Sequence, residues 1–164
     1  MKRVVLVRHA KSVPYGYDDD FNRDLANRGK NDAKLVSTEL NERGIFPDVM
    51  ISSPAKRALK TARIFGDNLN YKRSDIREVE DIYDGLTTSE FVRLINETPE
   101  NARTAFFFGH NPGFHYFVSN LLKNFYGDMP TCSTVGIDFN VDSWKDIEAR
   151  TGTMAFHIVP RMLK

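Results

Sequence analysis

The chain has 164 residues, with 23 lysines and arginines against 22 aspartates and glutamates, and its formal charge is +1. This balance excludes the strongly basic surface by which proteins bind nucleic acid or an anionic membrane, so neither is expected as a partner. The composition, 41% hydrophobic and 27% charged, is that of an ordinary globular protein, and we predict a single domain over residues 1–164.

Predicted strands and helices alternate along the chain. Gly44 supplies a stop signal for the first helix, Pro54 suits the first turn of the second, and Thr87 and Glu90 form a capping box for the third. The alternation predicts an α/β fold, a three-layer α/β/α sandwich with a mostly parallel central sheet. The predicted strands are residues 2–7, 49–52, 104–108, 135–141 and 153–159, with a weaker strand or loop over 76–82; helices are expected over 29–43, over a segment that includes 55–69, after the capping box, and after residue 113.

Cys132 is the single cysteine, which excludes an internal disulfide and a cysteine-rich zinc site and favours a reducing compartment. The longest apolar runs, residues 4–7 and 105–108, are far shorter than the ~20 residues needed to cross a bilayer. The apolar run near the first residue is also too short for a secretory signal. We therefore expect a cytoplasmic protein.

Polar residues follow the predicted strands at the point where each strand ends, and ligands of open α/β sheets bind at this edge. Arg8 and His9 follow the first strand, Arg57 comes shortly after the second, and His110 follows residues 104–108. An arginine fork matches phosphate oxygens in pairs, and a neutral imidazole can attack phosphorus and hold the phosphoryl group. These residue types therefore indicate phosphoryl chemistry in one cavity.

Four short motifs follow one another along the chain: residues 6–12 (LVRHAKS), Arg23-Asp24-Leu25 leading to Gly29, residues 52–58 (SSPAKRA) with Thr61-Ala62, and residues 109–113 (GHNPG). Together they resemble the motifs of the histidine phosphatase superfamily, also called the phosphoglycerate mutase-like superfamily, with Ala10 in place of the glycine in its Arg-His-Gly signature. The short length, Pro130-Thr131 and the ending Pro160-Arg161 are most similar to the compact SixA-type branch. A phosphoglycerate mutase-like fold is implied.

The resemblance implies that His9 is the nucleophile that becomes phosphorylated and that Arg8, Arg57 and His110 surround the phosphate. Fixed positive groups aimed at the phosphoryl oxygens lower the barrier, so neither a metal nor another cofactor is expected. The residues implied at the substrate are Arg23, Ser12 and Asn111.

A proton donor for the leaving group is the remaining part of the implied site. Glu80 stands three residues before Tyr83, as a glutamate does in the family, and Asp81 is the alternative. A phosphorylated imidazole is a better leaving group than an alkoxide and needs such an acid less. Nearer the first motif, we interpret Asp18, Asp20 and Asn22 as a mobile acidic rim rather than a calcium loop, because Arg23 replaces the turn glycine of such a loop.

The function expected from the resemblance is a metal-independent phosphatase that forms a phosphohistidine intermediate and dephosphorylates phosphohistidine in proteins. The alternative is a phosphatase of small phosphoesters or a phosphosugar mutase, and a noncatalytic phosphate-binding module is a third reading. The expected partner is thus a phosphorylated protein or a small phosphoester. The sequence leaves the oligomeric state undetermined.

Overall fold

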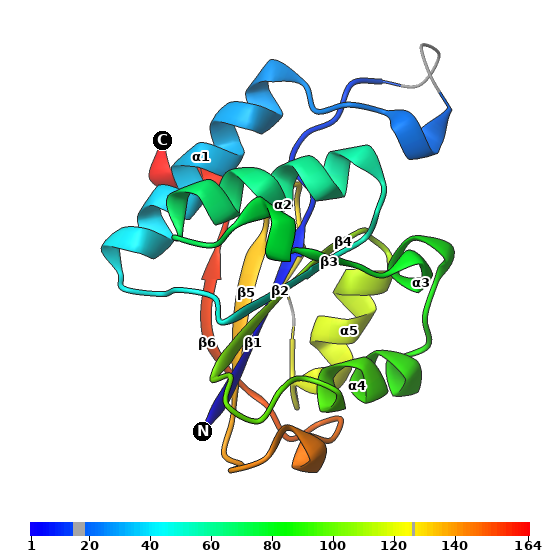
Figure 1. Ribbon diagram of the computed structural model, residues 1–164, viewed down its shortest axis with the longest axis vertical. Coiled ribbons are helices and arrows are strands. Elements are labelled where there is room, and N and C mark those ends of the chain that lie inside the picture. Colours follow the sequence, from blue (N-terminus) through cyan, green and yellow to red (C-terminus); the bar gives the residue numbers. More distant parts are fainter. Residues whose placement is uncertain (15–18, 126) are drawn as a thin grey trace.

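The computed structural model, which describes residues 1–14, 19–125 and 127–164, has a six-stranded sheet at its centre (Figure 1). Its strands are β1 (Lys2–Arg8), β2 (Val49–Ser52), β3 (Arg77–Glu78), β4 (Thr104–Gly109), β5 (Thr134–Phe139) and β6 (Thr153–Ile158). They are arranged in the order β3-β2-β4-β1-β5-β6. The first four strands of this order pair in parallel, while β5 is antiparallel to β1 and to β6. The predicted α/β class and mostly parallel sheet are confirmed.

Helices cover both faces of this sheet, which gives the three layers predicted from the sequence (Figure 1). The α-helices are α1 (Asn27–Glu42), α2 (Lys56–Asn68), α3 (Glu80–Asp84), α4 (Thr88–Asn96) and α5 (Gly113–Leu121), and short 3-10 helices are η1 (Asp20–Asn22), η2 (Arg73–Asp75), η3 (Trp144–Asp146) and η4 (Pro160–Leu163). One face carries α1 and α2, and the other carries α4 and α5.

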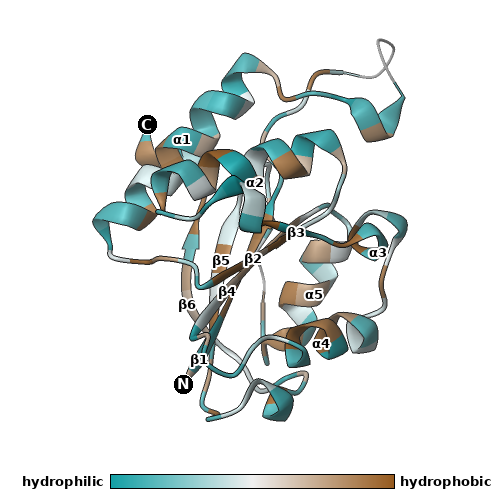
Figure 2. Ribbon diagram, viewed as in Figure 1, coloured by the Kyte–Doolittle hydropathy of each residue, from teal (hydrophilic) through white to brown (hydrophobic). Residues whose placement is uncertain are grey.

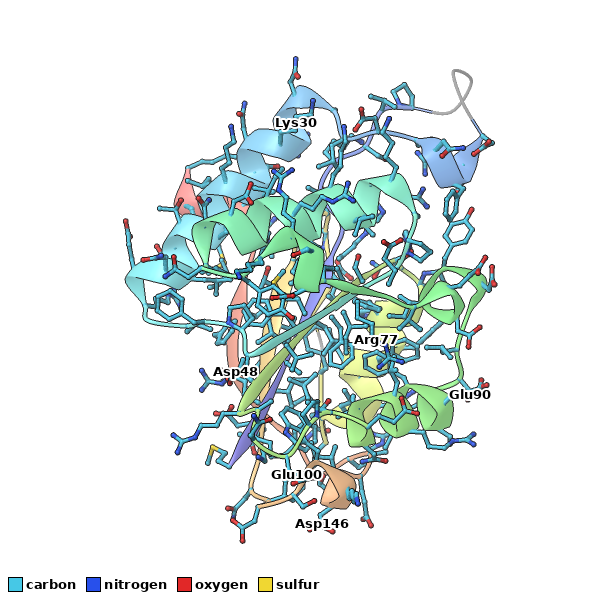
Figure 3. The ribbon with its side chains drawn as sticks, viewed as in Figure 1. Lys30, Asp48, Arg77, Glu90, Glu100 and Asp146 are labelled. Atoms are coloured by element: carbon cyan, nitrogen blue, oxygen red, sulfur yellow. The ribbon has the colours of Figure 1, made fainter. Side chains whose placement is uncertain are left out.

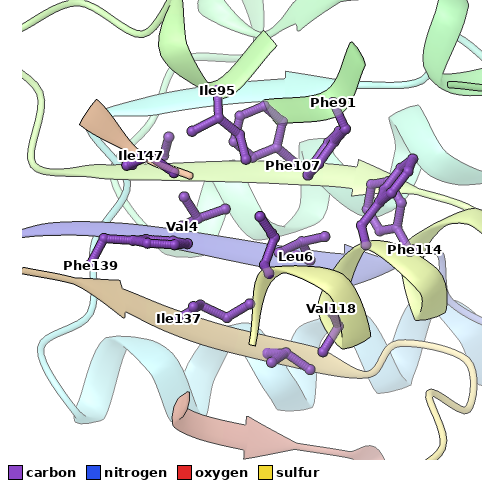
Figure 4. Packing of buried hydrophobic residues seen from close by; sticks show 14 of the residues in the cluster. Val4, Leu6, Phe91, Ile95, Phe107, Phe114, Val118, Ile137, Phe139 and Ile147 are labelled. Carbon is purple, nitrogen blue, oxygen red and sulfur yellow. The ribbon is translucent and has the colours of Figure 1, made fainter. Parts of the chain in front are cut away.

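The core consists of two apolar layers, one on each side of the sheet. Along β1, Val4 and Leu6 pack towards α4 and α5, whereas Val5 and Val7 pack towards α1 and α2. This alternation follows from the two-residue period of a strand, and burial of both faces explains why β1 is continuously apolar. The layer beside α4 and α5 is rich in phenylalanine (Figure 4). The apolar strands therefore form a rigid platform whose carboxyl ends can carry a site.

Polar residues lie on the outer surfaces of the helices, as the hydrophilic colouring of α1 shows (Figure 2). The charged side chains of Lys30, Glu90 and Asp146 lie at the periphery of the molecule (Figure 3). Within the described part of the chain, no helix is both long and apolar enough to cross a bilayer.

Two local predictions are wrong, one of them only in part. Pro54 precedes α2 instead of occupying its first turn, because the Ser53 hydroxyl accepts a hydrogen bond from the Ala55 N–H at 3.2 Å and forms a separate turn there. The prediction of a weaker strand or loop over 76–82 is confirmed at the two-residue strand β3 and is wrong at the last residues of the segment, which belong to α3. The acidic residues at 80 and 81 favour a helix start at this point, since they complement the positive end of the helix dipole.

Two glycines and one cap agree with their sequence signals. Gly44, which follows the C-cap residue Arg43 of α1, has φ +74°, a conformation that glycine adopts without strain. Gly29 lies so close to the loop after β1 that an added Cβ would overlap the carbonyl oxygen of Lys11. Thr87 and Glu90 form the predicted capping box of α4. The Gly29 contact matters most for function, because it packs α1 directly against the segment that follows His9.

Candidate active site

Arg8, His9, Arg57 and His110 converge at the carboxyl edge of the sheet, and these four residues are called the Arg-His cluster below. β1 and β4 pair in parallel with Arg8 opposite Gly109, so His9 and His110 each come one residue after this pair. Their ring centroids are 5.3 Å apart. Arg57 is the second residue of α2, which follows β2 on the far side of β4. Segments distant in sequence thus form one site, as predicted.

His9 has the chemical state of a nucleophile. Its side chain is buried, and its Nδ1 lies 2.7 Å from the Ala10 carbonyl oxygen. Because a carbonyl can only accept, Nδ1 carries the proton, and Nε2 keeps its lone pair. Burial lowers the pKa of His9 to about 4, opposed by the Ala10 hydrogen bond and reinforced by the charges of Arg57 and Arg8. The imidazole is therefore neutral near pH 7.

His110 is held by a serine from the second motif. Its Nε2 lies 2.8 Å from the Ser53 hydroxyl, while its Nδ1 is buried without a hydrogen-bond partner among the described residues. Burial, together with the charges of His9 and Arg57, lowers the pKa of His110 to about 3. A neutral ring bonded through Nε2 can present Nδ1–H as a donor, provided that the Ser53 hydroxyl donates to Nε2.

The low pKa values of the two rings predict how stability depends on pH. In the unfolded chain, both histidines have the ordinary pKa of about 6.5. In the folded protein, the pKa is about 4 for His9 and about 3 for His110. The free energy of unfolding should therefore fall as the pH drops from 7 to 5, a window above the ordinary titration of carboxylates. Urea unfolding at pH 7 and at pH 5 measures this difference in the free energy of unfolding. Equal or greater stability at pH 5 would contradict the assigned neutral state of the rings.

Three buried nitrogen atoms in the Arg-His cluster lack a hydrogen-bond partner within the described ranges: Arg8 Nε, Arg57 Nε and His110 Nδ1. A buried N–H without an acceptor costs about 1–3 kcal/mol, so such groups are expected to meet a ligand or water. Both terminal nitrogens of Arg57 are bound by Asp20, and Arg8 Nη1 donates to the Met129 carbonyl at 2.9 Å. The unpaired donors, one from each of three segments, fit an oxyanion such as phosphate.

Asp20 and Tyr83 belong to the surroundings of this cluster, and the sequence reasoning did not assign them there. The interpretation of Asp20 as part of a mobile rim is wrong, because its carboxylate binds Arg57 Nη2 at 3.1 Å and accepts from the Tyr83 hydroxyl at 2.8 Å. The Tyr83 ring also contacts the His110 ring. Asp18 of the same interpretation lies outside the described residues. A usable signal was the Asp20-to-Arg23 spacing, which permits an ion pair.

The residues predicted to complete the pocket differ in their contacts. Arg23 binds Asp20 Oδ1 through Nη2 at 3.0 Å and donates through Nη1 to the Ser12 hydroxyl at 3.2 Å. The charge of Arg23 also lowers the pKa of His9, after the larger effect of burial, which places it near the cluster. Asn111 donates to the Met129 carbonyl at 2.9 Å, the same oxygen that Arg8 binds. All three therefore lie beside the Arg-His cluster.

The two candidate acids, Glu80 and Asp81, are exposed in the first turn of α3. Tyr83 lies three residues after Glu80, so the two share a helix face, and Tyr83 contacts the cluster directly. Asp81 instead lines a shallow groove with Arg77 and Arg93. Among the described residues, neither carboxylate bonds to an arginine of the cluster. The acid therefore stays a prediction, with Glu80 the better placed of the two.

A groove of about 700 Å³ lies beside the cluster, which contributes Arg8 alone to its lining. Asn111, Met129, Val159 and Arg161 line it together with several neighbours. Volumes of this size are typical of ligand-binding clefts. In the described ranges, no three His, Cys, Asp or Glu side chains are grouped so that they could hold a metal ion.

Comparison with known proteins identifies the family. The sequence profile of the histidine phosphatase superfamily (branch 1) matches residues 4–113, which include every residue of the Arg-His cluster. The chain belongs to the histidine phosphatase superfamily, and it is a phosphatase of that superfamily.

The sequences of individual relatives are only moderately similar to this chain. An uncharacterized chloroplastic protein of Arabidopsis thaliana is 26% identical over 163 residues, which cover 92% of this chain and 72% of that protein. Phosphoserine phosphatase 1 of Hydrogenobacter thermophilus is 35% identical over 107 residues, which cover 63% of this chain and 50% of that protein. The chain thus spans about half the length of the second relative.

Solved structures share the whole fold. The protein histidine phosphatase SixA complexed with tungstate has a TM-score of 0.81 at 21% identity, and the match covers 99% of both chains. A SixA protein of Agrobacterium tumefaciens has the same TM-score and identity, with 97% and 98% covered. These matches confirm the SixA-type, phosphoglycerate mutase-like fold.

Proposed function

We propose that this protein is a metal-independent phosphatase that removes phosphate from phosphohistidine in proteins, through a phosphoryl group carried on His9. The observation that supports the proposal most directly is a neutral, buried imidazole with its Nε2 lone pair kept, among three unpaired donors from Arg8, Arg57 and His110. This arrangement brings a nucleophile together with the hydrogen-bond donors that a tetrahedral phosphate anion needs.

The reaction proceeds in two steps. In the first, the lone pair of His9 Nε2 forms a bond to phosphorus, and the bond from phosphorus to the substrate's imidazole nitrogen breaks with its electron pair staying on that nitrogen. The substrate ring carries a proton on its other nitrogen and so leaves as neutral imidazole, while His9 keeps Nδ1–H and becomes a phosphorylated imidazolium. In the second, water bonds to phosphorus, the bond to His9 Nε2 breaks with its electron pair returning to that nitrogen, and the protons of the water leave with the inorganic phosphate or pass to solvent. In both steps Arg8, Arg57 and His110 stabilise the negative charge on the phosphoryl oxygens.

Two observations support the substrate class. Three solved structures of the same fold carry the name SixA, and one of them is named a protein histidine phosphatase. The groove lined by Arg8 is open to solvent, which suits a phosphoryl group presented by a protein surface. The cytoplasmic location and single-domain organisation stay predictions.

The test is a comparison of kcat/KM on phosphohistidine-bearing carrier proteins and on a panel of phosphometabolites, with a chelator present throughout. The proposal expects the highest kcat/KM on a phosphohistidine protein and no loss of activity with the chelator, because the Arg-His cluster supplies the charge that a metal would otherwise supply. A preference for a metabolite, or activity that requires added metal, would overturn it.

Hydrolysis of small phosphoesters is the second candidate. The relative with 35% identity is named a phosphoserine phosphatase, and the groove volume of about 700 Å³ also suits a small metabolite. An alkoxide leaving group needs a proton donor, so this candidate depends more strongly on an acid.

Replacement of Glu80 by glutamine separates the two kinds of substrate. We expect Glu80→Gln to slow phosphoester hydrolysis by at least about tenfold and to leave phosphohistidine hydrolysis nearly unchanged, since general acid catalysis contributes most to the poorer leaving group. The matched control is Asp81→Asn, one residue away on the same exposed turn. Equal slowing of both reactions would count against this explanation, and a larger effect of Asp81→Asn would make Asp81 the acid.

A further inference from the structure

Asp20 makes an unusual set of contacts for a residue on a surface 3-10 helix. Its main-chain carbonyl accepts from Arg57 Nη1 at 2.6 Å, and its Oδ2 accepts from Arg57 Nη2 at 3.1 Å. The same Oδ2 accepts from the Tyr83 hydroxyl at 2.8 Å, and Oδ1 binds Arg23 Nη2 at 3.0 Å. One residue thus contacts two arginines and the tyrosine that packs on His110.

These contacts use one part of the Arg57 guanidinium and leave another part unused. Asp20 binds both terminal nitrogens, whereas Nε is buried and has no partner among the described residues. An arginine has five N–H donors in a rigid planar fork, so holding its end fixes the direction of its Nε–H as well. Phosphate can therefore bind at the Nε side while Asp20 stays in place.

The charge of Asp20 is maintained by the same contacts. Burial opposes ionisation of the carboxyl, but hydrogen bonds from Tyr83 and Arg57 outweigh it and hold the pKa of Asp20 well below its usual range. The carboxylate is consequently present throughout the pH range in which a phosphatase is assayed. It balances part of the positive charge of Arg23 and Arg57, which lie together near His9.

We propose that Asp20 is the positioning residue of the phosphate-binding arginines. It holds Arg57 by both terminal nitrogens and Arg23 by Nε and Nη2, so that the buried Arg57 Nε–H meets the phosphoryl oxygens. The inference rests on the proposed function, because it assumes that the Arg-His cluster binds a phosphoryl group. Asp20 itself touches no reacting atom in this arrangement and acts through the two arginines.

The test measures binding of inorganic phosphate and orthovanadate by calorimetry, which needs no turnover. Asp20→Asn keeps the size of the side chain and one carbonyl oxygen but loses the charge, and we expect it to weaken phosphate binding about tenfold. The control is Asp19→Asn, which removes the same charge one residue away, where Asp19 caps η1 and asparagine caps equally well. It should change the phosphate affinity less than twofold.

Two further variants distinguish positioning from a general loss of structure. In an Arg57→Ala background, Asp20→Asn should weaken phosphate binding by less than about threefold, because only Arg23 remains to be positioned. Tyr83→Phe keeps the carboxylate and removes one of its donors, and we expect a loss of about twofold to threefold with an unchanged Tm.

The outcomes separate this inference from the proposed function. Tighter phosphate binding by Asp20→Asn would mean that the carboxylate competes with phosphate, and unchanged or fully additive effects would mean that it does not act through Arg57; each overturns the inference. Failure of the proposed function would instead appear in the wild-type protein, as absent phosphate binding or absent turnover.

Discussion

Replacement of His9 by alanine is expected to lower kcat by more than about 10⁴-fold and to remove the acid-labile phosphoryl adduct, while the fold is retained. The reason is that Nε2 of this ring is the atom that forms the bond to phosphorus. The neighbouring imidazole of His110 has its Nε2 bonded to the Ser53 hydroxyl and presents Nδ1–H, a donor and not a nucleophile. Rapid quench with ³²P-labelled substrate measures the adduct, and steady-state kinetics measure kcat.

The informative comparison for His9→Ala is His110→Ala. That variant loses a donor to the phosphoryl oxygens but keeps the nucleophile, so a slowly formed adduct should still be detected. The circular dichroism spectra of both variants should match that of the wild type. If His9→Ala kept full activity, the covalent mechanism would be refuted, and an adduct that persisted in it would assign the phosphoryl group to another residue.

Replacement of Arg57 by alanine is expected to weaken the binding of phosphate and orthovanadate by about 100-fold. Arg57 is 5% exposed, and loss of a charge-assisted donor in such a site costs roughly 2–4 kcal/mol. Arg57→Lys should recover only part of the affinity, because an ammonium keeps the charge but lacks the rigid fork. Calorimetry with inorganic phosphate and with orthovanadate measures these affinities without turnover.

Lys56 is the matched control for Arg57. It is the neighbouring residue on α2, its side chain is 43% exposed, and its ion pair with Asp24 is 3.5 Å long. Exposed ion pairs of this kind contribute little, so Lys56→Ala should leave the anion affinity within about twofold of the wild type. Unchanged affinity in Arg57→Ala would place Arg57 outside the phosphate site.

The sequence predicted the parts of the site that depend on short-range patterns. The strand over 49–52 was located at its correct residues, and Arg8, His9 and His110 were expected together because parallel strands end at one edge of a sheet. The sequence also indicates the motif that leads to Gly29. The close approach of Gly29 to the Lys11 carbonyl is visible only in the three-dimensional structure.

The contacts of Asp20 were not predicted, and the reason is physical. Asp20 reaches Arg57 across 37 positions of sequence and Tyr83 across 63, and no periodicity links residues that meet through a loop and a short helix. The acid was not resolved for a related reason. Glu80 and Asp81 are adjacent charges on an exposed turn, and which of them faces a bound substrate depends on the substrate.

The Met129 carbonyl oxygen has a consequence for how this family can diversify. It accepts hydrogen bonds from both Arg8 and Asn111, yet it lies beyond residues 4–113, the part that the family profile matches. The Met129 side chain is buried in the core and is constrained there, but the two hydrogen bonds use only its main-chain oxygen and do not depend on that side chain. Its exposed neighbours, Asp128 and Pro130, line the same groove, so substitutions at these two positions can change the groove wall while the oxygen keeps both donors.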